Sequence, residues 1–430
     1  MKNVLIFPAG SEIGLELNRS LKHSMHFNLI GASSVDDHSK FAFKNYVSGV
    51  PFVNTDEFIP HINKLIKEHS IDYIFPAHDS VVVELSKAFS ENRLDCPVIT
   101  SKYEVADLCR SKKRTYDLFK DTITTPKQFK YEDIKNEDFP LFVKPDIGQG
   151  SKGACKVKDI EELDYCLSKD SSLLILELLP GKEYTIDCFT NHRGELLFAN
   201  GRTRNRISNG ISVNAIAAED SRFQEIALKI NNTLEFQGMW FFQVKEDSKG
   251  SLSLLEISPR VAGTMGYHRS KGQNLPLLAL FDKQNIDVSI IENNYHLEMD
   301  RALSNKYKID FKFNHVYIDL DDTIVIDNRV NPEVIGLVYQ FKSQNKKVNL
   351  ITAHKESYNE NTIEFLQKCF IDPKIFDKII DVRLSESKST YIKEDDAIFI
   401  DDSFAKRKEV SSNKNIPVFD VSEISVLQEL

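Results

Sequence analysis

Cysteine is sparse in this sequence, and no two cysteines have the C-x-x-C spacing that is typical of zinc sites and redox dithiols. Six cysteines in 430 residues predict free thiols in a reducing compartment. Long apolar runs are also missing, and the first short one, at residues 4–7, cannot serve as a signal peptide. We therefore expect a cytoplasmic protein with no membrane segment.

The sequence has no excess of basic residues. It contains 55 Lys and Arg against 64 Asp and Glu, and its net charge of −9 provides no basic surface for nucleic acid. Anionic small molecules must then be held by local Lys and Arg side chains, not by the field of the whole protein. With 430 residues, of which 41% are hydrophobic, the chain is long enough for several soluble domains.

The first 108 residues alternate strand and helix signals, which predicts a mostly parallel sheet covered by helices. The turn after the first strand lacks the full glycine pattern of a dinucleotide fingerprint, so a nicotinamide site is the minor alternative here. Ligands of such sheets bind beyond the carboxyl ends of the strands. The residues at those ends that could face a substrate are Gly10, Ser11, His78 and Asp79.

Residues 141–153 combine a short apolar strand, which ends in Lys144, with a glycine-rich loop. Glycine allows a close approach of the backbone to a ligand, and successive N–H groups in such a loop can point at phosphate oxygens. Lys144 and Lys152 add positive charge at both ends of the loop. The alternative is a hairpin turn with a surface lysine, because short glycine motifs often match by chance. The glycines of the loop are Gly148, Gly150 and Gly153.

The order of Lys144-Pro145 and the following Gly-Gln-Gly-Ser-Lys-Gly resembles the ATP-grasp superfamily. The resemblance covers residues 1–295 and implies ATP and Mg²⁺ as cofactors. In the family a lysine of the preceding helix, here expected at residues 108–120, reaches the phosphates; a solvated basic face is the alternative. Carboxylates near the adenine edge and the ribose also match. The implied ATP-binding residues are Lys112, Lys144, Gly148, Gly150, Ser151, Lys152, Gly153, Glu177, Leu179 and Glu183.

Two strands at residues 239–244 and 252–257 are joined by a polar turn, and this hairpin is expected to place Gln243 beside Glu256. Mg²⁺ prefers oxygen ligands such as these. Gln243, Glu256 and Ser258 match the metal positions of the ATP-grasp family in order, and Gln243 is similar to the carbamoyl-phosphate-synthetase-like branch. The family usually has Asn where this chain has Ser258. By the same resemblance, Arg260 meets the γ-phosphate or the acyl phosphate.

Arginine alternates with smaller residues at positions 202, 204 and 206. On one strand these three side chains would share a face. A clamp for a carboxylate or phosphate is the preferred interpretation, because Arg donates bidentate hydrogen bonds to such groups. Arg204 and Arg206 are the expected substrate contacts, and a solvated edge is the alternative.

The apolar residues 315–318 lead into an Asp-x-Asp-x-Thr sequence that begins at Asp319. An acidic turn or a calcium loop is the alternative, but the Gly and Glu that a calcium loop requires are absent. Three later pieces each follow a strand or start a helix. Together the four resemble the haloacid dehalogenase-like (HAD) phosphatase superfamily without a cap domain. The resemblance implies Asp319 as nucleophile, Asp321 as general acid and base, Thr352 and Lys388 as phosphoryl contacts, and Asp319, Asp321, Asp401 and Asp402 as magnesium ligands.

We therefore expect an α/β and α+β multidomain protein: a Rossmann-like domain at residues 1–108, an ATP-grasp domain at 109–295, a linker at 296–311 and a Rossmannoid HAD domain at 312–430. The expected function is an ADP-forming ligase that joins a small-molecule carboxylate to an amine, with a phosphatase that acts on a phosphorylated metabolite. A small-molecule kinase coupled to a phosphatase, or an ATP-binding regulatory protein with one degenerate site, are the alternatives. A homodimer is left open.

Overall fold

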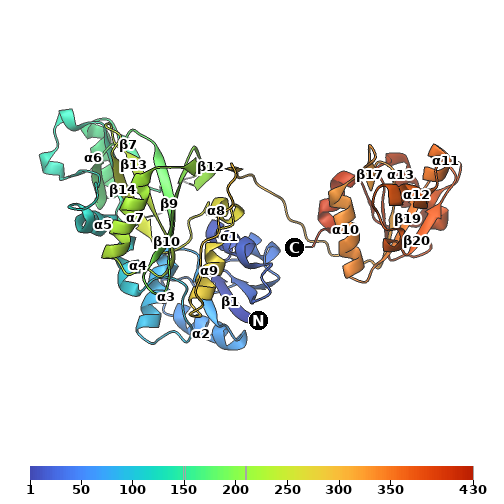
Figure 1. Ribbon diagram of the computed structural model, residues 1–430, viewed down its shortest axis with the longest axis horizontal. Coiled ribbons are helices and arrows are strands. Elements are labelled where there is room, and N and C mark those ends of the chain that lie inside the picture. Colours follow the sequence, from blue (N-terminus) through green and yellow to red (C-terminus); the bar gives the residue numbers. More distant parts are fainter. Residues whose placement is uncertain (149, 151, 209–210, 430) are drawn as a thin grey trace. The chain divides into compact units, whose positions relative to one another are not determined.

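The computed structural model describes residues 1–148, 150, 152–208 and 211–429. By its contacts, the chain divides into two compact units, Met1–Leu303 and Ser304–Leu430 (Figure 1). Ser151, one of the predicted ATP-binding residues, lies outside the described residues. In the described part of the chain, no helix has both the length and the apolar character needed to cross a bilayer.

The first unit begins with a parallel four-stranded sheet in the order β3-β2-β1-β4. Its strands are apolar because both faces are covered, as expected for a parallel sheet. Val98 lies beside β4 and forms an isolated parallel bridge with Ile74. The elements are β1 (Lys2–Phe7), α1 (Glu12–Leu21), β2 (Phe27–Ala32), β3 (Asn45–Val47), α2 (Phe58–Glu68), β4 (Tyr73–Pro76) and α3 (Asp79–Ser90).

A small antiparallel sheet in the order β5-β8-β6-β7 carries the glycine-rich loop between β6 and β7. One helix covers it, with Leu163 packed on the strand residues Leu141 and Val143. The elements are α4 (Tyr103–Arg110), α5 (Lys112–Phe119), β5 (Gln128–Phe129), β6 (Leu141–Pro145), β7 (Cys155–Val157), α6 (Ile160–Lys169) and β8 (Leu173–Glu177).

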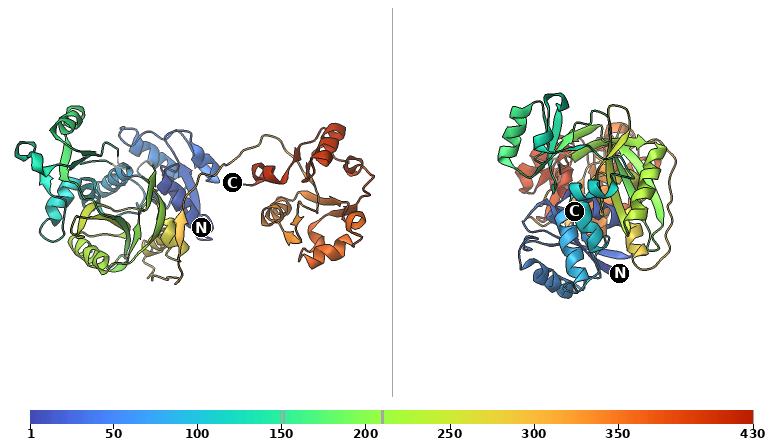
Figure 2. Two further views of the ribbon diagram at one scale, coloured as in Figure 1. Left: turned by 90° about the horizontal axis from the view of Figure 1, so that it is seen from above. Right: turned by 90° about the vertical axis from the view of Figure 1, so that its left-hand side faces the viewer.

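The largest sheet has the order β11-β12-β10-β9-β13-β14, and β15 pairs with β12. Helix α9 packs against α1, so the segment near residue 280 lies against the N-terminal segment (Figure 2). The elements are β9 (Glu183–Thr190), β10 (Leu196–Thr203), β11 (Arg206–Ser208), β12 (Ile211–Ala218), α7 (Ser221–Thr233), β13 (Gly238–Glu246), β14 (Leu252–Ser258), α8 (Gly266–Ser270), α9 (Leu275–Asp282) and β15 (Glu298–Asp300).

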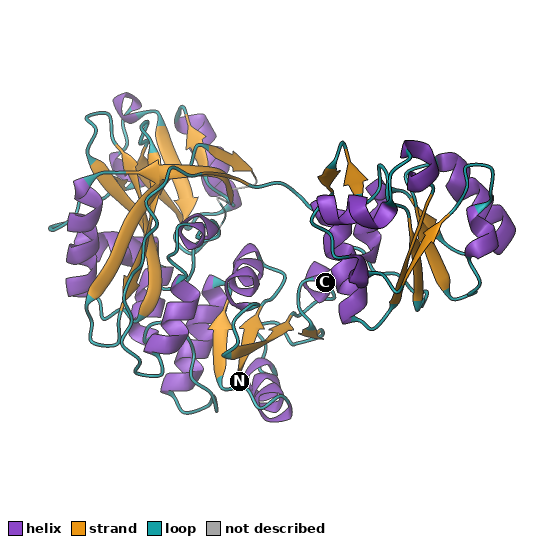
Figure 3. Cartoon of the chain, turned by 45° about the vertical axis from the view of Figure 1, so that its right-hand side comes forward, coloured by secondary structure: helices purple, strands orange, loops and turns teal. Residues whose placement is uncertain are grey.

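The second unit is a parallel five-stranded sheet in the order β20-β19-β16-β21-β22, with helices on both sides (Figure 3). A small hairpin, β17–β18, follows the central strand β16. The elements are β16 (His315–Ile318), β17 (Val325–Ile326), β18 (Arg329–Val330), α10 (Pro332–Ser343), β19 (Lys347–Thr352), α11 (His354–Tyr358), α12 (Thr362–Lys368), β20 (Lys378–Asp381), β21 (Ala397–Ile400), α13 (Phe404–Lys414) and β22 (Val418–Phe419).

Two local predictions are wrong. The single helix expected at residues 108–120 is two helices, because Ser111 has an extended backbone and its side chain caps α5 by accepting from Arg114 N. The strand expected to carry all three arginines stops at Thr203, and a new strand begins at Arg206. The arginines therefore do not share one strand face.

Candidate functional site

Lys144 lies at the end of β6, buried between the small sheet and β14 of the large sheet. Its Nζ is 3.5 Å from the Leu255 carbonyl oxygen and 5.4 Å from the ring centre of Tyr116. Burial lowers the pKa of Lys144 to about 8, although the Glu256 carboxylate favours the charged form. The charge of this buried ammonium is balanced only in part by Glu256, so Lys144 is suited to bind an anionic ligand.

The glycine-rich loop after Lys144 is tied to the junction of α4 and α5. The Ser111 hydroxyl donates to the carboxylate of Asp146, with Oγ to Oδ distances of 2.9 and 3.0 Å. Lys112 Nζ lies 3.2 Å from the Asp146 carbonyl oxygen and 3.3 Å from that of Gly148. The structure thus places Lys112 against the glycine-rich loop that follows Lys144, and the roles of these residues in ATP binding stay predictions.

Two glycines in this loop need a conformation that other residues rarely adopt. Gly150 has φ of +61° and Gly153 has φ of +74°, so a side chain at either position would strain the backbone. Lys152 is exposed between them. The backbone of the loop is consequently shaped by its glycines.

The side of the large sheet that carries the predicted metal residues is polar. Register pairs Gln243 with Glu256 across β13 and β14, which confirms that they are neighbours. Thr185 pairs with Gln243, and Glu183 with Lys245, so these side chains lie on the same side as Glu256. The alternating residues point to the other side and pack with α7, and they include Ile186, Trp240, Phe242 and Val244.

The other residues predicted near ATP have partners in the protein. Glu177 Oε1 accepts a 2.8 Å hydrogen bond from Lys127 N, which fixes the carboxylate at the end of β8. Leu179 is buried two residues further on. Glu183 forms a 3.2 Å ion pair with Arg204 Nε.

Arg260 and Ser258 both contact Asp79, the first residue of α3. Arg260 Nε and Nη2 lie 2.8 and 2.6 Å from the two carboxylate oxygens of Asp79, and Ser258 Oγ donates to Oδ1 at 2.8 Å. Burial alone would raise the pKa of Asp79, but Arg260 and Ser258 hold it well below its usual range. The sequence predicted that Asp79, which follows β4, could face a substrate. Its pairing with Arg260 could not be predicted from the sequence.

A cleft of about 60 Å³ lies between these elements, with Asp79, Arg110, Lys112, Glu256, Ser258 and Arg260 in its lining. Arg110 was not among the predicted residues. Its Nη1 donates to the Gly148 carbonyl oxygen at 3.2 Å and so links α4 to the glycine-rich loop. Nothing in the sequence distinguished Arg110 from the basic residues that follow it at positions 112–114.

The three arginines near residue 204 separate. Arg202 is buried and pairs with Asp187 at 2.8 Å, while Arg206 is exposed and pairs with Asp300 at 2.6 Å. The roles of Arg204 and Arg206 in substrate binding stay predictions.

The second unit gathers its acidic residues at the carboxyl end of the parallel sheet. Asp319 follows β16, and Asp401 and Asp402 follow the neighbouring strand β21. One oxygen from each of these three carboxylates lies within 4.8 Å of the others. Lys388 is buried between them, with Nζ 2.7 Å from both Asp319 Oδ1 and Asp401 Oδ2.

The charges at this cluster depend on one another. Burial, together with the Asp401 carboxylate, raises the pKa of Asp319 to about 7, although Lys388 acts in the opposite direction. The same carboxylates raise the pKa of Lys388, although its burial acts in the opposite direction. Three carboxylates and one ammonium leave a net negative site, and oxygen donors in this arrangement fit Mg²⁺.

Asp321 and Thr352 contact each other. Thr352 Oγ1 lies 3.3 Å from Asp321 Oδ2, and His354 Nδ1 lies 2.7 Å from Asp321 Oδ1. Asp402 is held by Thr323, whose Oγ1 accepts from Asp402 N at 3.1 Å. The structure therefore brings the predicted residues of this unit into two contacting groups, and only the tertiary structure reveals that Thr323 of the motif holds Asp402 and that His354 contacts Asp321.

One protein family matches part of this chain, and a curated relative and several solved structures are similar to it. Residues 169–304 match the family described as "ATP-grasp in the biosynthetic pathway with Ter operon". The carbamoyl phosphate synthase large chain of Clostridium perfringens is 25% identical over 241 residues, which are 50% of this chain and 22% of that protein. The chain thus matches only about a fifth of the length of this relative.

Two solved structures have a similar fold. The biotin carboxylase domain of 2-oxoglutarate carboxylase from Hydrogenobacter thermophilus, in complex with MgADP, ADP and bicarbonate, has a TM-score of 0.58 at 16% identity, over 69% of this chain and 73% of that one. The L-amino acid ligase from Bacillus licheniformis has a TM-score of 0.52 at 17% identity, over 65% of this chain and 73% of that one. Over about two thirds of its length the chain thus shares the fold of these two structures, and the family match lies in the first unit except for its last residue.

Proposed function

We propose that the protein is an ATP-dependent carboxylate–amine ligase of the carbamoyl-phosphate-synthetase-like branch, linked to a magnesium-dependent HAD-type phosphatase. The observation that supports the ligase most is the polar sheet face of Glu183, Gln243 and Glu256, which Lys144 approaches from the small sheet. The proposed domains are residues 1–108 and 109–295 for the ligase and 312–430 for the phosphatase, with a linker at 296–311.

In the ligase, ATP lies between the glycine-rich loop and the polar sheet face. The backbone near Leu179 meets the adenine, Glu177 fixes that edge, and Glu183 accepts from the ribose hydroxyls. Lys112 and Lys144 offset the charge of the phosphates. Gln243 and Glu256 offer adjacent oxygens for Mg²⁺, which stabilises the phosphate charge when bound. Ser258 already donates to Asp79, so it is the weakest of the three proposed ligands.

The reaction proceeds through an acyl phosphate. A substrate carboxylate oxygen bonds to the γ-phosphorus as the bond to ADP breaks, and the amine then displaces phosphate from the acyl carbon and loses a proton. Arg260 is held in position by two hydrogen bonds to Asp79 and stabilises the transferred phosphoryl group. Catalysis is thus chiefly orientation and charge stabilisation.

In the phosphatase, the Asp319 carboxylate attacks phosphorus and forms an aspartyl phosphate. Asp321 protonates the leaving oxygen and later takes a proton from the attacking water. Thr352 and Lys388 contact the phosphoryl oxygens. Asp319, Asp401 and Asp402 would hold Mg²⁺ together with the Asp321 backbone carbonyl, and this ion would offset the negative charge of the cluster.

The test is mass spectrometry of the products that the full chain makes from ATP, Mg²⁺ and a pool of carboxylates, amines and phosphorylated metabolites. Wild type is run beside Lys144→Met, Asp319→Asn and the control Asp395→Asn, which changes an exposed carboxylate before β21. We expect Lys144→Met to lose amide formation and Asp319→Asn to accumulate a phosphorylated amide. The control should match wild type.

The remaining outcomes separate the alternatives. ADP release that does not depend on an amine, with a phosphorylated acid as product, would identify a small-molecule kinase. ATP binding without turnover by either unit would identify a regulatory protein. The same amide from wild type and Asp319→Asn would show that the phosphatase acts on another substrate.

A further inference from the structure

Large apolar side chains are exposed around the acidic cluster of the second unit. Tyr358 is 59% exposed, Phe404 is 71% exposed and Ile326 is 39% exposed. A single exposed apolar residue is ordinary, but three around one polar site mark a surface that is covered by something else. We call Tyr358, Phe404 and Ile326 the rim.

Tyr358 is connected to the proposed general acid through one residue. Its ring centre is 5.0 Å from that of His354, and His354 Nδ1 is 2.7 Å from Asp321 Oδ1. The negative charge of Asp321, ahead of burial, raises the pKa of Tyr358. Stacking of His354 on Phe365, at 4.1 Å between ring centres, fixes this side of the rim.

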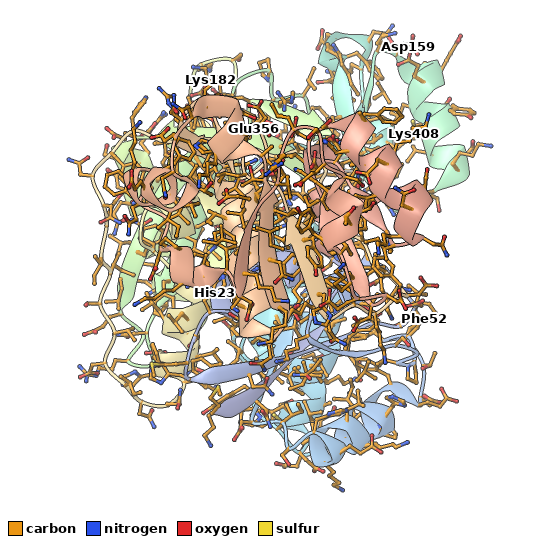
Figure 4. All side chains as sticks on the ribbon, turned by 90° about the vertical axis from the view of Figure 1, so that its right-hand side faces the viewer. His23, Phe52, Asp159, Lys182, Glu356 and Lys408 are labelled. Carbon is orange, nitrogen blue, oxygen red and sulfur yellow. The ribbon has the colours of Figure 1, made fainter. Side chains whose placement is uncertain are left out.

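Phe404 lies on the opposite side. It is the first residue of α13, two positions after Asp402. Strand β16, which leads into Asp319, is flanked in the sheet by β19 and β21, and the segments after these two strands carry Tyr358 and Phe404 respectively. Figure 4 labels Glu356 on α11 and Lys408 on α13, which lie on the two sides of these strands.

Ile326 comes from the hairpin β17–β18. This hairpin is joined to the catalytic segment, because Asp322 N donates to the Val325 carbonyl oxygen at 2.8 Å. The three rim residues thus come from three segments, which follow Asp319, Thr352 and Asp402 in the chain.

We infer that the rim binds the leaving group of the phosphatase substrate, and that this substrate is a phosphomonoester with a flat aromatic ring. The inference rests on the proposed phosphatase. Two exposed aromatic rings on opposite sides of the site offer faces or edges to a planar group, and this contact favours aromatic over saturated rings. In this proposal the acidic cluster binds the phosphoryl group and the rim binds the ring.

The reaction is the one proposed above, with the ring on the departing alcohol. The Asp319 oxygen bonds to phosphorus, the ester P–O bond breaks and the alcohol leaves with the proton from Asp321. Water then attacks the aspartyl phosphate, which releases inorganic phosphate and frees Asp319. The rim contacts the ring and takes no part in bond making.

The test compares benzyl phosphate with cyclohexylmethyl phosphate, using the full chain and Mg²⁺. The two alcohols are of similar acidity, so the comparison measures recognition of the flat ring. For wild type we expect kcat/KM for the benzyl ester to be roughly 2- to 10-fold higher. Tyr358→Ala and Phe404→Ala should lose this preference through KM with little change in kcat, while Tyr358→Phe and Phe404→Tyr should keep it.

The control is Phe370→Ala. Phe370 is also highly exposed, at 99%. It lies between α12 and the first residue of β20, so it belongs to the end of the sheet where the strands begin, away from the carboxyl ends that carry the acidic cluster. It should leave the preference unchanged. p-Nitrophenyl phosphate serves as an activated reference substrate for all proteins.

The outcomes distinguish the inference from the function on which it rests. Hydrolysis of p-nitrophenyl phosphate without a benzyl preference, or a preference that survives both alanine variants, overturns the rim and leaves the phosphatase intact. No hydrolysis of any ester by wild type overturns both. A loss of preference in Phe370→Ala as large as in the rim variants also overturns the rim.

Discussion

At the scale of single residues, both units place a buried charge where an anion would bind. In the first unit this is Lys144, whose pKa is lowered to about 8 because burial outweighs the nearby Glu256. In the second unit it is Lys388, which two carboxylates keep charged. The two lysines differ in their pKa shifts. Two carboxylates outweigh the burial of Lys388, whereas burial outweighs the nearby carboxylate at Lys144.

The pH dependence of nucleotide binding follows from Lys144. The ammonium binds phosphate, and in the free protein it is lost as the pH rises through about 8, so affinity for ATP should fall above that value. For one linked proton the fall is at most about tenfold per pH unit. Titration calorimetry from pH 7 to 9.5 measures it, with Lys144→Arg as the control that remains charged. An affinity that is flat in wild type would contradict the prediction.

The buried pair of Asp79 and Arg260 should matter for stability. Asp79→Ala leaves the Arg260 guanidinium buried without its carboxylate, which we expect to destabilise the protein by roughly 3–5 kcal/mol. Urea unfolding measures this. Asp287→Ala, which removes the partner of Arg193 in an exposed pair, should cost less than about 1 kcal/mol. Equal effects of the two variants would show that Asp79 is not holding Arg260 as described.

At the scale of elements, the small sheet owes its covering layer to the contact between β7 and α6. Leu163 of the helix packs in the core of this sheet. Cys155 on β7 and Cys166 on α6 have sulfur atoms 3.4 Å apart, and both are free thiols. The sequence spacing of eleven residues gave no indication of this proximity.

This proximity predicts a disulfide under oxidation. Diamide should link Cys155 to Cys166 with the loss of two hydrogens, detected by mass spectrometry of the intact chain and its peptides. Burial, together with the hydrogen bond to Cys166, raises the pKa of Cys155 to about 11, so the reaction should quicken as the pH rises and more thiolate forms. Cys155→Ser is the control. A link between other cysteines, with this pair still reduced, would refute the prediction.

At the scale of the whole molecule, the two units are joined by a segment without regular structure. Residues 301–313 contain no helix or strand, and Lys306 and Lys308 within them are exposed. Such segments are preferred sites of proteolysis. The last strand of the first unit, β15, ends just before it at Asp300, inside the expected linker.

Brief trypsin digestion should therefore cleave after Lys306 or Lys308 and give two folded fragments. Adding Mg²⁺ should raise the melting temperature of the C-terminal fragment, because the ion binds the folded carboxylate cluster and not the unfolded chain. EDTA should reverse the effect, and Asp401→Asn should abolish it. An Mg²⁺ effect that survives Asp401→Asn would place the ion elsewhere, and cleavage mainly inside either unit would contradict the two-unit description.

Elements with local patterns could be predicted from the order of the amino acids alone. Apolar runs such as residues 315–318 and 397–400 became buried parallel strands, and the acidic residues after them met because the carboxyl ends of parallel strands share one edge. The pairing of Gln243 with Glu256 was likewise predictable from a short hairpin.

Contacts between segments that are distant in the chain could not be predicted in this way, because they form only when the chain folds. Asp79 and Arg260 are 181 positions apart, and the break at Ser111 is stabilised by Asp146, 35 positions away. The arginines at 202–206 separate because each finds a different carboxylate, on β9 or β15. Periodicity describes one segment at a time, whereas a charged side chain takes the partner that folding brings to it from elsewhere in the chain.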